Sequence, residues 1–302
     1  MGGVAGGLAP ASDVFSGHGV ERDRRAVRSP LLRRTATGIA ALLLAASALS
    51  GCVAVESAAD PIVVLPPAGA TPDYQLGGAY EPAEGVGVVG RDRSDPPADG
   101  VYSICYVNGF QTQPGELDDW DDDLLLRTDG ETVFDPDWPD EALLDTSTSD
   151  RRDRIAAMVG PWIRACGDAG YSGVEFDNLD SYTRSSGALT LDDNLALASA
   201  LVDIAHTAGL AAGQKNAAED AAELHERAGF DFAVVEECAA YEECAAYAAV
   251  YGDAVIDIEY TDGLPRPFAE MCADEESPAS MVLRDRELLT PSDFRHVFET
   301  CR

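Results

Sequence analysis

Eight short apolar or alternating runs, most of them separated by amphipathic helical patterns, constrain the fold of this chain more than any other feature. Alternation of strands and helices is typical of a parallel sheet covered by helices, and eight such strands can close into a barrel. The sequence therefore predicts an α/β fold, a TIM-type (β/α)8 barrel. The expected strands are residues 74–76, 86–89, 102–107, 173–176, 211–214, 232–235, 255–258 and 281–283.

Helical patterns lie between most of these runs. The clearest covers residues 192–208, where apolar residues recur at helical spacing and Gly209 follows as a stop signal. Residues 111–150 are acidic and irregular and contain Trp120 and Trp138, so we expect an extended loop over the barrel mouth. The other expected helices are residues 151–169, 217–227, 241–251, 268–275 and 291–301.

The N-terminal region has the features of a secretion signal. Six arginines lie between Arg22 and Arg34, an apolar run follows over residues 36–49, and small residues precede Cys52. The run is too short to span a bilayer, which takes about 20 apolar residues. The cysteine resembles that of a bacterial lipobox, so we expect lipidation at Cys52 and a lipid-anchored, extracytoplasmic protein on the cell surface. The alternative is an ordinary cleaved signal with an incidental cysteine.

These features divide the chain into three parts. Residues 1–51 are expected to be a signal peptide of the lipoprotein type. Residues 52–72, rich in Ala and Pro, are expected to be a flexible tether. The length of residues 73–302 suits one barrel domain better than two domains.

The chain is strongly acidic, with 54 Asp and Glu against 21 Lys and Arg and a net charge of −33. Such a surface repels nucleic acid and attracts cations. The charge has two interpretations: solubility or salt adaptation, and recognition of a cationic substrate. We expect a monomer without a cofactor, and no nucleic-acid partner.

Six cysteines follow Cys52, and an even number in an exported protein indicates disulfides. Cys238 and Cys244 are close in sequence and are expected to pair. The other four, Cys105, Cys166, Cys272 and Cys301, allow three pairings that the sequence does not distinguish. A zinc site is disfavoured, because no CxxC motif is present and only two histidines lie in mid-domain.

Polar residues follow four of the expected strands, at the ends that converge on one mouth in a barrel. A pair of carboxylates at such a mouth suits glycoside hydrolysis, in which one acid protonates the leaving oxygen and the second attacks or activates water. The candidate site residues are Glu175, Asp177, Asn178, Asp180, Tyr182, Lys215, Asn216, Glu236, Glu259 and Tyr260.

Asp177 and Glu236 are the expected catalytic pair. Asp177 lies nearer the rim than Glu175, which shares its side of the strand and can simply bond to neighbours. Neighbouring acids are expected to keep Glu236 protonated, because like charges raise a carboxyl pKa. Lys215, the only lysine in the chain, is expected to tune a carboxylate or to bind a sugar hydroxyl.

Several blocks of the sequence resemble glycoside hydrolase family 114, the endo-α-1,4-polygalactosaminidases. The similar blocks are residues 73–76, 105–106, 173–182, 213–216, 236–244 and 258–260. The resemblance implies a TIM barrel, endo-hydrolysis of a galactosamine-containing polysaccharide, a catalytic pair at Asp177 and Glu236, and a disulfide between Cys238 and Cys244. The segments after the second and third strands, residues 90–93 and 107–120, depart from the family pattern, which puts the exact polymer in doubt.

The acidic surface fits this resemblance, because a partly deacetylated galactosaminan is a polycation. Two other functions are compatible with the same residues. One is a non-catalytic glycan-binding lipoprotein, and the other is a barrel aldolase that uses Lys215 as a Schiff-base lysine. The sequence leaves open whether the anomeric configuration is retained or inverted.

Overall fold

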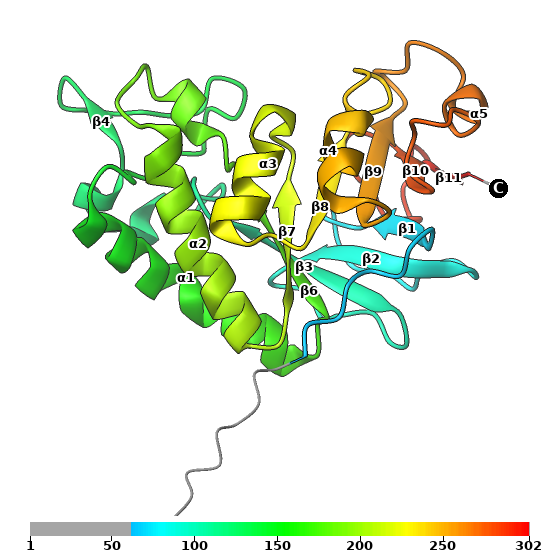
Figure 1. Ribbon diagram of the computed structural model, residues 1–302, viewed down its shortest axis with the longest axis horizontal. Helices are drawn as coiled ribbons and strands as arrows, with labels where there is room; N and C mark the ends of the chain where they lie inside the picture. Colours follow the sequence, from blue (N-terminus) through cyan, green and yellow to red (C-terminus); the bar gives the residue numbers. More distant parts are fainter. Residues whose placement is uncertain (1–61, 302) are drawn as a thin grey trace, which may run out of the picture. The chain divides into compact units, whose positions relative to one another are not determined.

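The computed structural model describes residues 62–301, whose centre is a barrel of parallel strands (Figure 1). Each barrel strand pairs in parallel with the next, which confirms the predicted TIM-type barrel. A further strand, β11 (Phe298–Thr300), pairs antiparallel with the last of them. The barrel strands are β1 (Thr71–Tyr74), β2 (Val86–Asp92), β3 (Tyr102–Asn108), β6 (Gly173–Asp177), β7 (Ala211–Lys215), β8 (Phe232–Glu236), β9 (Val255–Tyr260) and β10 (Ser280–Arg284).

One arginine side chain joins the first and last barrel strands. Arg284 of β10 is fully buried, and its guanidinium donates to Asp73 Oδ1 at 2.8 Å and to the Tyr74 carbonyl of β1. It also donates to the carbonyls of Leu289 and Val297. β1 and β10 lie next to each other without ladder hydrogen bonds, so this charged contact closes the barrel.

Helices cover the outside of the barrel, and Figure 1 shows α1, α2 and α3 side by side along it. Thr190 and Asp193 form a capping box at the start of α2, whose Leu197 and Leu201 are fully buried. The helices are α1 (Ser149–Ala169), α2 (Leu191–Thr207), α3 (Ala221–Glu223) between the single turns η4 (Ala218–Asp220) and η5 (Leu224–Ala228), α4 (Cys244–Tyr251) and α5 (Phe268–Met271).

Alternation along the strands decides which side chains fill the barrel. Phe232 and Val234 of β8 pack inside it, whereas Val235 packs against the helices. A Cβ atom added to Gly213 of β7 would lie 2.6 Å from the Phe232 ring, so glycine makes room for a large neighbour. The same alternation directs the last side chain of β8, Glu236, toward the barrel mouth.

The expected helix over residues 291–301 is wrong. Turns occupy residues 291–295, and β11 begins at Phe298. The backbone of Val297 donates to Asp285 Oδ2, and its carbonyl accepts from Arg284, so two charged groups next to β10 hold this segment as a strand partner. Long-range contacts of this kind outweigh the local helical pattern.

The segment between β3 and α1 is a long loop, as predicted, and its apolar side chains pack partly in the main core and partly in a small separate cluster. Leu124, Leu143 and Leu144 in it are fully buried. Its short elements are η1 (Leu117–Asp119), η2 (Asp122–Leu124), β4 (Arg127–Thr128) and β5 (Glu131–Thr132). A loop packed in this way can hold side chains in fixed positions over the barrel mouth.

Three disulfides connect the six described cysteines. The expected pair Cys238–Cys244 is present. Of the three pairings left open for the other cysteines, the structure has Cys105 with Cys166 and Cys272 with Cys301. The first links β3 to α1, and the second ties the segment after β11 to the end of α5.

The expected signal peptide over residues 1–51 and the lipidation site Cys52 lie outside the described residues, as do residues 52–61 of the expected tether over residues 52–72. Strand β1 begins at Thr71, and the Val64 carbonyl already accepts a hydrogen bond from the Tyr102 hydroxyl. Within residues 62–301, none of the helices is both long enough and apolar enough to cross a bilayer.

Candidate active site

A cleft of about 530 Å³ opens at the C-terminal ends of the barrel strands. In TIM barrels this is the face that carries the chemistry. Six strands each contribute one side chain to it from their last residue or close to it: Asp92, Tyr106, Asp177, Lys215, Glu236 and Tyr260.

Asp177 is the last residue of β6, and its side chain is 18% exposed. The Tyr106 hydroxyl of β3 donates to Oδ2 at 2.8 Å, and the backbone of Asn178 donates to Oδ1 at 2.7 Å. One donor on each oxygen fixes the carboxylate in a single orientation at the floor of the cleft.

Glu236 ends β8 and accepts hydrogen bonds from three side chains. Lys215 Nζ donates to Oε2 at 2.6 Å, Asn216 Nδ2 donates to the same oxygen at 3.2 Å, and the Tyr260 hydroxyl donates to Oε1. Burial opposes ionisation of Glu236, but the charge of Lys215 and these hydrogen bonds outweigh it and lower the pKa of Glu236 to about 2. Glu236 is therefore ionised at neutral pH, and the expectation that nearby acids keep it protonated is wrong.

Lys215 lies between the two carboxylates. Its Nζ is 2.6 Å from Glu236 Oε2 and 3.8 Å from Asp177 Oδ2. The two oxygens are therefore separated by no more than these two distances combined. Asp177 and Glu236 face one compartment, and a single sugar unit can reach both.

The turn after each of these strands explains the residue types found there. β6, β7 and β8 are each followed by a residue in the left-handed region, at Asn178 (φ 62°), Asn216 (φ 50°) and Glu237 (φ 60°). Asparagine tolerates this region better than most residues. Glu237 is held there by Arg286, whose Nη1 and Nη2 each donate to it at 2.8 Å.

The cleft geometry agrees with a sequence comparison. A family model described as Glycoside-hydrolase family GH114 matches residues 53–302. The chain belongs to glycoside hydrolase family GH114. The resemblance inferred from the sequence is thereby confirmed, and this GH114 chain is a glycoside hydrolase.

Two solved structures are similar to the GH114 chain. Aspergillus fumigatus Ega3 in complex with galactosamine is 22% identical, with a TM-score of 0.64 over 81% of this chain and 100% of that chain. The glycoside hydrolase domain of PelA from Pseudomonas aeruginosa is 15% identical, with a TM-score of 0.47 over 76% of this chain and 98% of that chain. No curated protein matches the sequence.

Glu175 lies below the GH114 cleft and does not line it. Its side chain is fully buried, and the Tyr74 hydroxyl donates to Oε1 at 2.7 Å. Burial raises the pKa of Glu175 to about 8, although Lys215 acts in the opposite direction. The predicted substrate contact of Glu175 is therefore wrong, and this carboxyl is protonated beneath Lys215 at neutral pH.

This protonation predicts a pH-dependent stability. An unfolded glutamate ionises near 4.5, whereas folded Glu175 keeps its proton until about pH 8. The folded state thus binds more protons in this window, so Glu175 makes the free energy of unfolding fall as pH rises, by up to about 1.4 kcal/mol per unit. We expect Glu175→Gln to remove this slope, measured by urea unfolding from pH 5 to 8. The exposed Glu226→Gln is the matched control, and an unchanged slope in Glu175→Gln would contradict the protonation.

Asn178, Asp180, Lys215, Asn216 and Tyr260 all line the cleft, as predicted. Tyr182 does not line it, because its hydroxyl donates to Asp220 at 2.9 Å. Glu259 points away from the barrel and accepts from the backbones of Ala239 and Ala240, so it holds the loop after β8. The substrate-binding prediction is wrong for Tyr182 and Glu259.

The residues that line the cleft without having been predicted from the sequence include Tyr106, Arg286, Trp138 and Glu141. Alternation in β3, with Tyr102 and Ile104 inside the barrel, could have identified Tyr106 as the next inward side chain. No comparable pattern in the sequence indicates that Arg286, Trp138 and Glu141 line the cleft. Arg286 follows the last strand by two residues, and Trp138 and Glu141 belong to the long loop after β3.

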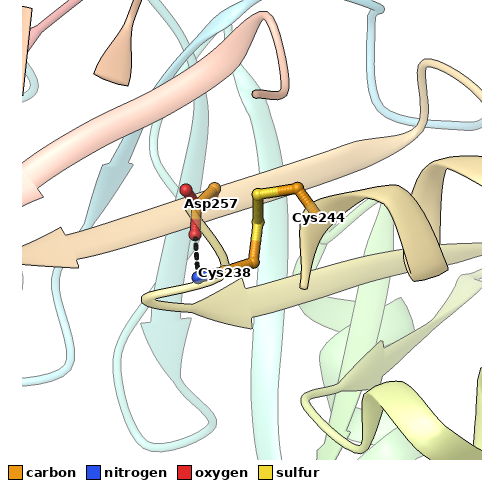
Figure 2. Close-up of side chains that lie close together, drawn as sticks. All are labelled: Cys238, Cys244 and Asp257. Carbon is orange, nitrogen blue, oxygen red and sulfur yellow. Dashed lines mark hydrogen bonds between the residues drawn. A yellow bond between two sulfur atoms is a disulfide. The ribbon is translucent and has the colours of Figure 1, made fainter. Parts of the chain in front are cut away.

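One cluster in the described part of the chain has the spacing of a metal site. Cys238, Cys244 and Asp257 bring their ligand atoms within 4.8 Å of one another. Figure 2 shows that the two sulfurs form a disulfide and that the Cys238 backbone donates to Asp257. Thiolate is the form of cysteine that binds metals, and sulfurs joined in a disulfide are not thiolates. This cluster therefore stabilises the segment after β8.

Proposed function

We propose that this GH114 hydrolase cleaves α-1,4-linked galactosamine or N-acetylgalactosamine polysaccharide internally, with Asp177 and Glu236 as the reacting pair. The observation that carries the proposal is the placement of both carboxylates around Lys215 at one barrel mouth. One carboxylate attacks the anomeric carbon or activates water, while the other protonates the leaving oxygen. Ionised Glu236 can attack or act as a base at once, and it can act as the acid only after it takes up a proton.

The separation of the pair favours retention of the anomeric configuration. Inverting enzymes hold their carboxyl groups about 6.5–9.5 Å apart to admit a water, and retaining enzymes about 5–5.5 Å apart. The two distances from Lys215 Nζ, taken together, stay below the inverting range for the nearest oxygens. We therefore propose a covalent glycosyl-enzyme intermediate.

The charge of the cleft supports a cationic substrate. Eight carboxylate residues line the cleft, against the three cationic residues Arg184, Lys215 and Arg286. Each of these cations forms ion pairs with carboxylates of the chain. Net negative charge is therefore left to attract the amines of deacetylated galactosamine. The similar Ega3 structure, which contains galactosamine, points to the same sugar.

The Schiff-base alternative does not fit Lys215. Burial lowers the pKa of this amine, but the carboxylates of Asp177 and Glu236 outweigh burial and raise it above its usual range. A Schiff base forms from the neutral amine, which this site does not provide at neutral pH.

We also propose that lipid at Cys52 anchors the enzyme to the outside of the cell. The basic residues, the short apolar run and the cysteine of the N-terminal region support this proposal. We expect the full chain to partition into the detergent phase of a Triton X-114 extraction and Cys52→Ser to partition into the aqueous phase. Equal partitioning of both would contradict anchoring at this cysteine.

Product analysis tests the function. Purified enzyme is incubated with de-N-acetylated α-1,4-galactosaminan and with its N-acetylated form, and the products are sized by mass spectrometry. We expect oligomers of several lengths early in the reaction, with faster cleavage of the cationic polymer and inhibition by salt. Release of monomer alone would contradict internal cleavage, and intact polymers would contradict hydrolysis. Binding without cleavage is the outcome that a non-catalytic glycan-binding protein gives.

A further inference from the structure

Residues 135–141 of the long loop after β3 form a closed turn, called here the Trp138 loop. The Asp135 backbone donates to the Glu141 carbonyl at 2.9 Å, and the Glu141 backbone donates to the Trp138 carbonyl at 2.9 Å. Asp135 Oδ1 accepts from the backbones of Asp137 and Trp138 at 2.8 and 3.3 Å. The loop conformation is thus fixed from within, including the backbone that presents the Trp138 side chain.

The Trp138 loop is also fixed relative to the strand that carries Asp177. Asp135 is buried, and its Oδ2 accepts from Gln111 Nε2 at 2.7 Å and pairs with Arg184 Nε at 2.6 Å. Arg184 in turn donates to Asp180 Oδ1 at 2.9 Å and to Asn178 Oδ1 at 3.1 Å, directly after β6. The loop and the catalytic floor therefore form one wall of the cleft.

Trp138 is the exposed tryptophan of this wall. It keeps 59% of its surface exposed, whereas Trp120 keeps 5% and packs edge-on against Trp162. A large aromatic residue exposed at the side of a cleft is a binding surface rather than a core residue. The apolar face of a pyranose ring is a partner of matching size.

Glu141 lies in the same wall, close enough to Asp177 for the two charges to interact. It lines the cleft, and Asn108 Nδ2 donates to its Oε2 at 3.1 Å. Asn108 is the register partner of Asp177 across β3 and β6. Burial and the charge of Asp177 raise the pKa of Glu141 to about 7, so a cationic group bound here would draw the proton off.

We propose that the Trp138 loop is a subsite for a second hexosamine unit of the chain, next to the unit at Asp177 and Glu236. Trp138 stacks on the sugar ring, and Glu141 accepts a hydrogen bond from the amine of a deacetylated unit. The inference rests on the proposed function for the identity of the sugar, and it extends the substrate along the cleft.

Binding to an inactive enzyme tests the subsite. The probe is an α-1,4-linked galactosamine hexamer, titrated into full-chain Glu236→Gln while tryptophan fluorescence and calorimetric heat are recorded. We expect the hexamer to change the Trp138 emission, and we expect Trp138→Ala in the same background to weaken binding at least about tenfold. Phe294→Ala is the matched control, because Phe294 is 96% exposed and does not line the cleft, and it should change binding less than twofold.

Glu141→Gln provides the second arm of the test. We expect it to weaken binding of the galactosamine hexamer several-fold and to leave binding of the N-acetylated hexamer within twofold. Thermal unfolding of each variant checks that the fold is intact. Hexamer affinity within twofold of the parent in Trp138→Ala, or equal losses for both hexamers in Glu141→Gln, would overturn the subsite.

The subsite and the proposed function can fail separately. If the wild type cleaves galactosaminan while Trp138→Ala keeps its hexamer affinity and KM, the subsite is wrong and the hydrolase function stands. If the wild type cleaves nothing while hexamer binding depends on Trp138, the subsite stands and the hydrolase function is wrong. No detectable hexamer binding to Glu236→Gln would overturn the subsite as well.

Discussion

Asp177→Asn and Glu236→Gln are each expected to lower kcat/KM on galactosaminan by at least about a thousandfold. In the proposed mechanism each removes a group that acts on the scissile bond, and such groups contribute far more than tenfold. Both replacements keep the side-chain shape. In Glu236→Gln the amide oxygen can still accept from Lys215 and Asn216, and the amide nitrogen can donate to the Tyr260 hydroxyl. The measurements are the initial rate at which new reducing ends form and the affinity for the hexamer. The affinity should be retained in both variants.

Glu226→Gln, an exposed change in η5, is the control and should keep full activity. A loss under tenfold in either variant would contradict its role in the pair. Azide added to Asp177→Ala and Glu236→Ala assigns the two roles, with an aryl galactosamine oligomer as substrate because its phenolate leaves without a proton. The variant that lacks the nucleophile gives a glycosyl azide of inverted configuration, and the variant that lacks the acid/base gives one of retained configuration.

Lys215→Met is expected to have the second largest effect, on both activity and stability. Lys215 is buried and offsets the charges of Glu236 and Asp177. Its loss leaves two partly buried carboxylates without a cation, which should reduce the free energy of unfolding by about 2–3 kcal/mol at pH 7. The pKa of Glu236 should rise from about 2, because the lysine charge that lowers it is gone.

Two measurements test whether Lys215 balances the charges of the two carboxylates. Urea unfolding at pH 7 and pH 4 should show a smaller difference from wild type at pH 4, where the carboxylates of the variant begin to take up protons. The pH profile of kcat/KM should show a titration that the wild type lacks in the same range. Arg295→Met removes an exposed cation and should change stability by less than about 0.5 kcal/mol. Equal stability of Lys215→Met and wild type at pH 7 would contradict the balancing role.

The barrel and the placement of Asp177 and Glu236 at its mouth could be predicted because they depend on short-range patterns. Alternation of apolar and acidic residues in β6 places Glu175 and Asp177 on one side, and the strand end makes Asp177 the rim residue. Strand β8 is apolar up to its last residue, Glu236, which marks that strand end. Because the barrel strands are parallel, the C-terminal ends of β6 and β8 lie at the same mouth.

Strand β9 shows where such patterns fail. Both faces of this strand are buried, with Ile258 and Tyr260 inside the barrel and Asp257 and Glu259 toward the helices. Polarity therefore did not indicate which side faced the mouth, and Glu259 was assigned to the cleft together with Tyr260. The protonation of Glu236 was misjudged because it depends on the distance to Lys215, which the sequence does not contain.

The Trp138 loop could not be predicted in detail for a related reason. Its position depends on Asp135 meeting Arg184 and Gln111, three residues from separate segments. The sequence indicated a loop over the mouth, and it contained no pattern that would place Trp138 in the cleft and Trp120 in the core. Side-chain contacts between segments far apart in the sequence determine the position of this wall of the cleft.

The central claim is that Asp177 and Glu236 flank one glycosidic bond and cleave it by double displacement. Proton NMR of the first product tests it most directly, by following the anomeric signal of a galactosamine oligomer during cleavage and before mutarotation. We expect the α-anomer to appear first, because two displacements restore the configuration of the α-linked substrate. The β-anomer as the first product would contradict the claim.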